Sequence, residues 1–225
     1  MKKTVFIVML MISSVFVFGQ TKVKADEIIR QINNGEKIHY KNVEITGNLH
    51  LYDLKNLEHH EGNTYHSYAA KEIIFENCKF RGKVLGYYHD DYENETYAIQ
   101  FEDKVTFVNC TFRKETTFKY SEFNKSADFS GSKFHNGTSF KYALFREKAD
   151  FSNVNFMDDI IFKYTVFDEE IDFSKTSFER EADFKYTRFE DNVSFQNAQF
   201  DEDPIFKYAR IKGRKAKNKL HRMTR

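Results

Sequence analysis

Lys-Tyr pairs that could hold an anionic or sugar partner recur every 22 residues along this chain. A lysine ammonium attracts anions, and a tyrosine offers an apolar ring and a hydroxyl that can hydrogen-bond. Because a fixed spacing places equivalent residues on one side of a repeating structure, the pairs predict two adjacent columns on one outer surface. The candidate binding residues are Lys119, Tyr120, Lys141, Tyr142, Lys163, Tyr164, Lys185 and Tyr186, and the series continues to Lys207 and Tyr208.

The lysine column has two explanations at the sequence level. Like charges stacked directly opposite one another are normally unfavourable, so a partner that neutralises them would explain why they are present. Alternatively, tandem duplication of a 22-residue unit left identical Phe-Lys-Tyr triplets behind, and stacked tyrosine rings stabilise the coil. Both explanations stay open.

Histidines and carboxylates gather in two polar segments, but their spacing matches no defined metal motif. There is no HExxH, no HxxxH and no CxxC, so we expect a solvated surface with no metal and no cofactor. No nucleophile elbow, phosphate loop or supported Ser/His/Asp spacing is present either, so we expect no enzyme. The residues considered as metal ligands are His59, His60, His66, His89, Asp90 and Asp91.

The Lys-Tyr pairs belong to a longer repeat of phenylalanine at alternating steps of five and six residues. Nineteen consecutive Phe keep this register from Phe107 to Phe206, and Ile211 takes the next slot. A small or β-branched residue lies two positions before nearly every Phe, and in extended backbone residues i and i−2 point to the same side. A large and a small inward residue on each side would fill a narrow tube, whereas the spacing builds no helical stripe.

Three segments carry a resemblance to a known family: 127–131 (ADFSG), 149–153 (ADFSN) and 182–186 (ADFKY). They resemble the A(D/N)(L/F)xx units of pentapeptide-repeat proteins, in particular the Phe-rich branch in which five- and six-residue units alternate. The resemblance covers 98–211 without a gap and 38–85 more loosely. It implies an all-β solenoid, a right-handed four-sided parallel β-helix of about 22 residues per coil, with the central Phe and the small residue inside.

The first 19 residues have the composition of a secretory signal peptide. Lys2 and Lys3 precede an apolar run, and we expect cleavage between Gly19 and Gln20. An uncleaved membrane anchor is the alternative, although the run is short for a span. The mature chain is therefore expected to be exported, periplasmic or extracellular, with no transmembrane segment.

A short amphipathic helix is predicted within 20–37, the N-terminal linker and cap. Asp26 is the expected N-cap and Gly35 the expected exit. After it, the series Ile38, Val43, Leu49 and Leu54 keeps the steps of five and six, so we expect the coil to begin there with aliphatic residues in place of Phe. The predicted β-helix spans 38–211.

Two insertions interrupt the register, near 58–70 and 86–95. Segment 75–81 is a near copy of 107–113 at a distance of 32 residues, so about ten extra residues lie between them. Without them, Cys78 and Cys110 share the small slot on adjacent coils, with Cα atoms about 4.8 Å apart. This spacing permits a Cys78–Cys110 disulfide, which export would favour. Cys also suits the slot as a small apolar residue, so free thiols remain an alternative.

Charge is distributed unevenly along the chain. Residues 25–206 hold all 34 acidic residues and only 22 of the 35 basic ones, a net charge of −12, and the tail 212–225 has no acidic residue. The first hypothesis is an exported, non-enzymatic scaffold that binds an unknown protein or glycan of the bacterial envelope. The resemblance to pentapeptide-repeat proteins, some of which are acidic rods that mimic DNA, implies a first alternative, a rod that binds a topoisomerase. The second alternative is a glycan-binding or glycan-active β-helix. Export makes nucleic acid the weakest partner.

Overall fold

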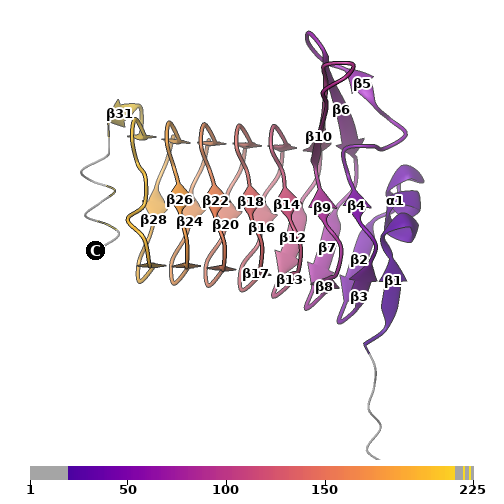
Figure 1. Ribbon diagram of the computed structural model, residues 1–225, viewed down its shortest axis with the longest axis horizontal. Coiled ribbons are helices and arrows are strands. Elements are labelled where there is room, and N and C mark those ends of the chain that lie inside the picture. Colours follow the sequence, from indigo (N-terminus) through magenta and orange to yellow (C-terminus); the bar gives the residue numbers. More distant parts are fainter. Residues whose placement is uncertain (1–19, 216–219, 221–222, 224–225) are drawn as a thin grey trace, which may run out of the picture.

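The computed structural model describes residues 20–215, 220 and 223, which form one coil of short strands (Figure 1). Apart from three strands added antiparallel, each strand pairs in parallel with its equivalent in the next circuit, so four sheets form the four sides. This arrangement confirms the parallel β-helix predicted from the Phe spacing. The predicted signal segment, 1–19, lies outside the described residues.

The four sides follow each other along the chain in the order B, A, C, D. Side A contains β1 (Lys22–Lys24), β3 (Glu44–Thr46), β8 (Lys79–Phe80), β13 (Thr111–Phe112), β17 (Lys133–Phe134), β21 (Asn155–Phe156), β25 (Ser177–Phe178) and β29 (Gln199–Phe200). Side B contains β2 (Ile38–Lys41), β7 (Ile73–Glu76), β12 (Val105–Val108), β16 (Ala127–Asp128), β20 (Ala149–Asp150), β24 (Ile171–Asp172) and β28 (Val193–Ser194).

Sides C and D complete the circuit. Side C contains β4 (Leu49–His50), β9 (Val84–Leu85), β14 (Thr116–Thr117), β18 (Thr138–Ser139), β22 (Ile160–Ile161) and β26 (Ala182–Asp183). Side D contains β6 (Thr64–Ala69), β11 (Glu95–Phe101), β15 (Glu122–Phe123), β19 (Leu144–Phe145), β23 (Val166–Phe167), β27 (Arg188–Phe189) and β30 (Arg210–Ile211), with β5 (Glu58–His59), β10 (Tyr87–Asp90) and β31 (Arg214–Lys215) added antiparallel.

The interior is a set of phenylalanine stacks. Phe112 lies opposite Phe134 in the ladder, and their ring centres are 4.4 Å apart with planes 1° from parallel. Hydroxyls in the small slot also join the coils, since Thr165 Oγ1 donates to the Phe140 carbonyl at 2.7 Å. A buried hydroxyl is therefore satisfied without an added polar partner, which explains why Ser and Thr alternate with Ala in this column.

The first coil corrects one part of the sequence interpretation. Ile38 and Val43 do not replace Phe, because the ladders pair Tyr40 with Phe75 and Ile45 with Phe80. The predicted aliphatic series therefore follows the small slot two residues earlier. Both columns advance by five and six, so the steps alone do not distinguish them.

Helix α1 (Ala25–Asn33) packs against β1, β2 and β4 at one end of the coil, as the predicted cap would. Its N-cap is Lys24 and carries no side-chain cap bond, so the prediction of Asp26 as N-cap is wrong. Asp26 instead lies in the first turn, where a carboxylate interacts favourably with the helix dipole. Gly35 does form the exit, with φ of +72°.

The described part of the predicted tail is folded at the opposite end of the coil. Strand β31 (Arg214–Lys215) turns back antiparallel onto β30, and Leu220 is buried in the core. The sequence interpretation treated 212–225 as a basic tail only and missed this contribution to the core. Among the described residues, no helix is long and apolar enough to cross a membrane.

The fold generates a prediction about two phenylalanines. All the described repeat Phe from Phe101 to Phe206 are buried except Phe200, which is partly exposed because it lies on β29, the last strand of side A. Truncation of the fully enclosed side chain in Phe151→Ala should lower the free energy of unfolding by roughly 3–5 kcal/mol. Phe200→Ala is the matched control and should have a clearly smaller effect. Urea unfolding followed by circular dichroism measures both, and equal losses would contradict the enclosed core.

Candidate functional site

The predicted binding tyrosines lie at the corner where side C turns into side D, and all have a left-handed backbone. Their φ angles run from 57° to 64°, a region that residues other than Gly, Asn and Asp seldom adopt. The diagonally opposite corner has the same backbone conformation and uses mainly Asn and Gly. The two sets are Tyr120, Tyr142, Tyr164, Tyr186 and Tyr208 against Asn109, Gly131, Asn153, Lys175 and Asn197.

Stacking between the rings compensates for this backbone conformation. Neighbouring tyrosine ring centres from Tyr120 to Tyr208 are 4.6 to 4.7 Å apart. An aromatic pair contributes about 0.5–1.5 kcal/mol beyond its burial. A left-handed residue with a Cβ costs about 1–2 kcal/mol. The two terms are similar, so folding alone gives tyrosine no clear advantage over asparagine at this corner.

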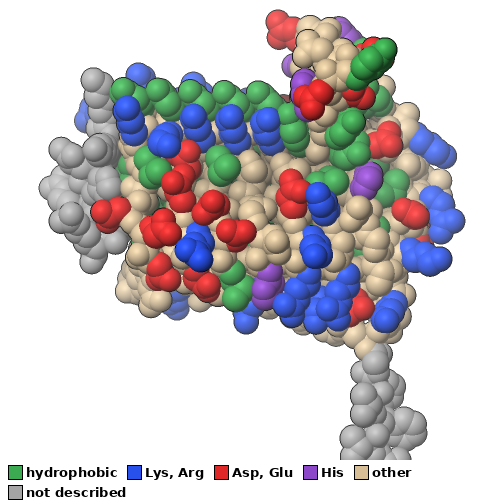
Figure 2. Space-filling model, viewed as in Figure 1, with side chains coloured by type: hydrophobic (Ala, Val, Ile, Leu, Met, Phe, Trp, Pro, Cys, Tyr) green, Lys and Arg blue, Asp and Glu red, His purple; other side chains and the backbone are tan. Residues whose placement is uncertain are grey.

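The stacked rings cover each other's faces and leave their edges to solvent. Tyr142 is 36% exposed and Tyr208, at the end of the column, 54%. The column therefore does not present open ring faces on which flat molecules could stack. It presents a row of ring edges and phenol hydroxyls. Figure 2 shows a hydrophobic band with a row of basic side chains beside it along one edge of the coil.

The predicted lysines lie directly beside this row, and we call the two columns together the Lys–Tyr ladder. Lys141 Nζ and Lys163 Nζ lie 5.1 and 5.3 Å from the ring centres of Tyr142 and Tyr164. Within the described residues, neither ammonium has a carboxylate within 4.0 Å, whereas Lys185 pairs with Asp183 at 3.6 Å.

The electrostatics of the ladder follow from this arrangement. Partial burial and the neighbouring charges of Lys119 and Lys163 lower the pKa of Lys141. The first lysine is held differently, because Lys119 Nζ donates to the Tyr87 hydroxyl at 2.9 Å. The ladder is therefore a line of cations whose mutual repulsion is only partly relieved inside the molecule.

The two predicted insertions are paired hairpins and not separate loops. Strand β5 pairs antiparallel with β6, β10 pairs antiparallel with β11, and β11 lies parallel to β6. Together they extend side D beyond the coil as a small sheet, which projects near the α1 end in Figure 1. We call this sheet the hairpin projection.

An aromatic cluster on and beside the hairpin projection was missed by the sequence interpretation. Ring contacts lead from Tyr52 through Tyr88 and Tyr97 to Tyr65, with centres 5.2, 6.1 and 5.3 Å apart. Hydrogen bonding to the Glu95 carboxylate and burial raise the pKa of Tyr97 to about 12. The tyrosine-rich composition of both insertions was the available signal, but it did not reveal that they pair.

A groove lies between strand β10 of the hairpin projection and side C of the coil. It has a volume of about 700 Å³, and Tyr87 and Tyr88 form part of one wall. Thr117, Ser139 and Ile161 form part of the other. Lys119 lines the groove as well, so the groove and the Lys–Tyr ladder share a residue.

The histidines and acids considered as metal ligands lie on different strands of the hairpin projection. His60 and His66 stack with ring centres 4.4 Å apart, while His89 Nε2 lies 3.6 Å from Asp91. Burial and the charge of His60 lower the pKa of His66, which limits its protonation. Within the described part of the chain, no three His, Cys, Asp or Glu gather as a metal site.

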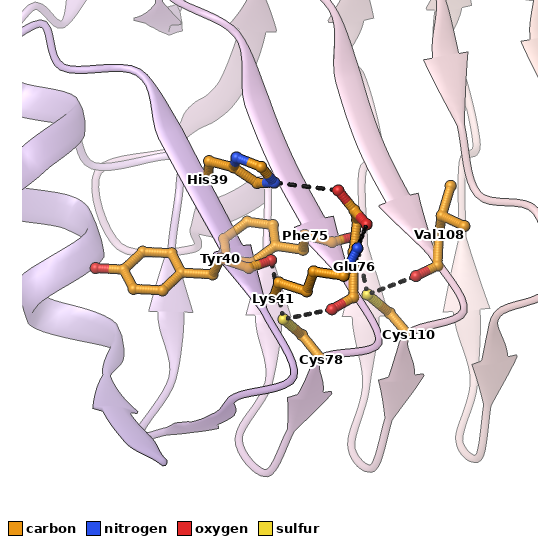
Figure 3. A network of polar contacts seen from close by, with 8 residues as sticks. All are labelled: His39, Tyr40, Lys41, Phe75, Glu76, Cys78, Val108 and Cys110. Carbon is orange, nitrogen blue, oxygen red and sulfur yellow. Dashed lines mark hydrogen bonds and ion pairs between the residues drawn. The ribbon is translucent and has the colours of Figure 1, made fainter. Parts of the chain in front are cut away.

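The two cysteines occupy equivalent slots on adjacent coils (Figure 3). Both are buried and free, and each sulfur lies near a carbonyl: Cys78 Sγ is 3.3 Å from Glu76 O, and Cys110 Sγ is 3.3 Å from Phe75 O. The predicted disulfide stays a prediction. On the outer face of the same coil, the Glu76 carboxylate accepts hydrogen bonds from Lys41 and His39, which lower its pKa.

Comparison with known proteins gives one match. A family model described as pentapeptide repeats (9 copies) matches residues 99–143, 118–165 and 162–210. No curated protein and no solved structure matches the chain. The matched segments carry the whole Lys–Tyr ladder, while both hairpins of the projection precede residue 99 except for the end of β11.

The balance between ring stacking and backbone conformation can be measured at one corner. Tyr164→Asn removes two ring contacts and introduces a residue that adopts the left-handed region more readily, as Asn153 does at the opposite corner. We expect the free energy of unfolding to change by about 1 kcal/mol or less, because the two terms nearly cancel. A loss as large as that of an enclosed Phe would show that the column is a structural requirement.

The cysteine environment predicts slow alkylation. Burial raises the pKa of Cys110, so little reactive thiolate forms at mildly alkaline pH. We expect iodoacetamide to leave Cys110 unmodified in the folded protein and to modify it in urea, as measured by peptide mass. Modification in urea only after a reductant is added would reveal the Cys78–Cys110 disulfide.

Proposed function

Because this chain belongs to the pentapeptide-repeat family, we propose that it is a rigid, non-enzymatic scaffold of the bacterial envelope that binds an elongated partner along the Lys–Tyr ladder. The observation that carries the proposal is the state of Lys141 and Lys163. They are stacked in line, close enough for the charge of Lys163 to contribute to the lowered pKa of Lys141, which the more distant Asp183 only partly opposes. Neither ammonium has a carboxylate within 4.0 Å among the described residues, whereas Lys185 pairs with Asp183. An anionic partner along this line would remove the repulsion.

The coil keeps the ladder straight and its spacing fixed. Around each lysine, the backbone bonds to the next coil, as where Tyr142 N donates to the Lys163 carbonyl at 3.1 Å. Below the corner, Phe140 and Phe162 stack at 5.3 Å. Binding to such a surface requires little ordering of the protein, which favours affinity for a partner of matching repeat.

The alternative of a DNA mimic would use the acidic side of the coil. Asp128, Asp150 and Asp172 form a column on side B, but each carboxylate accepts a backbone N–H two residues later, at 2.7 to 2.8 Å. These aspartates thus support the corners of the coil. Lys148 also lies among them, paired with Glu170 at 3.1 Å, so the column is not a continuous anionic surface.

The alternative of a glycan-active enzyme would place carboxylates in the groove. Glu115 and Asp159 both line it, but Glu115 is paired with Lys83 at 2.8 Å. Asp159 accepts the Glu181 N–H at 3.2 Å, and Asp91, which also lines the groove, lies 3.6 Å from His89. Each of these carboxylates thus has a partner within the protein, which favours binding without catalysis for this groove.

The envelope location rests on the sequence of 1–19 and has a direct measurement. We expect the intact mass of the protein purified from its native host to equal that of a chain beginning at Gln20. A mature chain that still begins at Met1 would remove the support for cleavage and export.

Contact along the ladder can be tested by photo-crosslinking in the native host. A photoreactive phenylalanine analogue at position 142 should form crosslinks to envelope material, because the edge of this ring faces solvent. The same analogue at position 133, exposed on side A, is the control. Crosslinks at both positions, or at neither, would contradict the Lys–Tyr ladder as the binding surface.

A further inference from the structure

We propose that the partner of the Lys–Tyr ladder is a linear acidic glycan with one carboxylate on each sugar, bound along the axis of the coil. This inference rests on the proposed function and names the chemistry of the partner. It follows from three properties of the ladder: its spacing, its hydrogen-bond donors and its covered ring faces.

The spacing of the ladder matches that of an extended sugar chain. Equivalent residues on adjacent coils are one strand spacing apart, about 4.8 Å. A pyranose in an extended glycan advances the chain by a similar length. Because consecutive sugars turn opposite sides outward, the carboxylates on one face of the glycan would meet about every second lysine. The side-by-side tyrosine rings, 4.6 to 4.7 Å apart, show that this spacing is maintained at the surface.

The donors of the ladder suit carboxylates. An ammonium and a phenol hydroxyl both donate hydrogen bonds, and bonds from a charged donor to a carboxylate are about twice as strong as neutral ones. Burial and the neighbouring lysines lower the pKa of Lys141. Bound carboxylates would act in the opposite direction and stabilise its charged form. A neutral glycan offers hydroxyls to the same donors but no charge, so it would leave the repulsion in place.

The covered ring faces disfavour single-stranded nucleic acid. Proteins that bind it without sequence preference stack bases on exposed aromatic faces, in addition to binding the phosphates. Tyr142 is stacked on Tyr120 on one side and on Tyr164 on the other, at 4.7 Å each, so neither of its faces is open to a base. The ladder thus has the cationic side chains of a site for single-stranded nucleic acid but lacks the open aromatic faces on which bases would stack.

The hairpin projection gives the bound chain a defined end. Tyr87 contacts Tyr120 with ring centres 5.8 Å apart, and its hydroxyl binds Lys119. Lys119 also lines the groove beside it, so the ladder meets the groove at this residue. Glu115 and Asp159 line the groove further from the ladder and would repel carboxylates, so the acidic chain would begin at Tyr87 and extend along the lysines away from the projection.

Calorimetric titration of the full chain with oligogalacturonate tests the inference. We expect binding that weakens as salt is added, and no measurable binding of a neutral glucan oligomer of the same length. In Lys141→Gln/Lys163→Gln, affinity should fall roughly tenfold or more, since each lost charged hydrogen bond is large enough for a tenfold change. The matched control is Lys125→Gln/Lys148→Gln, which removes the same charge from lysines paired with Glu147 and Glu170.

Each outcome of the titration bears on the inference. Circular dichroism and unfolding curves must first show that both double variants are folded. Loss of binding in the ladder variant alone supports the inference. Equal losses in both variants, equal binding of the neutral oligomer, or tighter binding of single-stranded DNA would overturn it. If crosslinking at position 142 captures a protein instead, the ladder remains a binding surface and only the glycan assignment fails.

Discussion

The rest of this structure depends on one interaction: each side chain stacks on the equivalent side chain of the next turn of the β-helix. Phe123 and Phe145 are 4.4 Å apart with planes 1° from parallel, and the same register carries the outer residues. Interior and exterior residues repeat with the same period, so a shift in strand register would move the buried Phe and the exposed Lys and Tyr together. The core therefore fixes the positions of the surface lysines and tyrosines, which directly follow an interior Phe in each Phe-Lys-Tyr triplet.

Most of the coil could be predicted from the sequence because its period is carried by large side chains that must be inside. Phe107 and Phe75 lie in register despite the inserted residues between them, as their copied neighbours indicate. The first turn of the β-helix was harder to assign from the sequence, since Ile38 and Tyr40 both point inward. Only the strand pairing shows that Tyr40 takes the Phe slot. The hairpin projection could not be predicted, because pairing of β6 with β11 joins segments from two separate insertions.

The candidate site illustrates the same limit. Its residues were identified from their spacing, but its chemistry depends on which atoms remain accessible. Stacking covers the faces of Tyr142 and leaves its edge, so the accessible part of the column is a row of ring edges and hydroxyls and not an open ring face. Tyrosine occupies the left-handed position of this corner in five successive turns, whereas the opposite corner uses mainly Asn and Gly. This difference agrees with a role for the tyrosine side chains in binding in addition to folding.

The dependence of affinity on glycan length tests the central claim most directly, because it compares the repeat of the ligand with the repeat of the ladder. Galacturonate oligomers should bind more tightly as they lengthen, with a gain about every second sugar as a further carboxylate faces the lysines, until the chain spans the column from Lys119 to Lys207. Beyond that length the affinity per chain should level off. Affinity that is independent of length, or that keeps rising at the same rate for chains much longer than the column, would contradict recognition by the Lys–Tyr ladder.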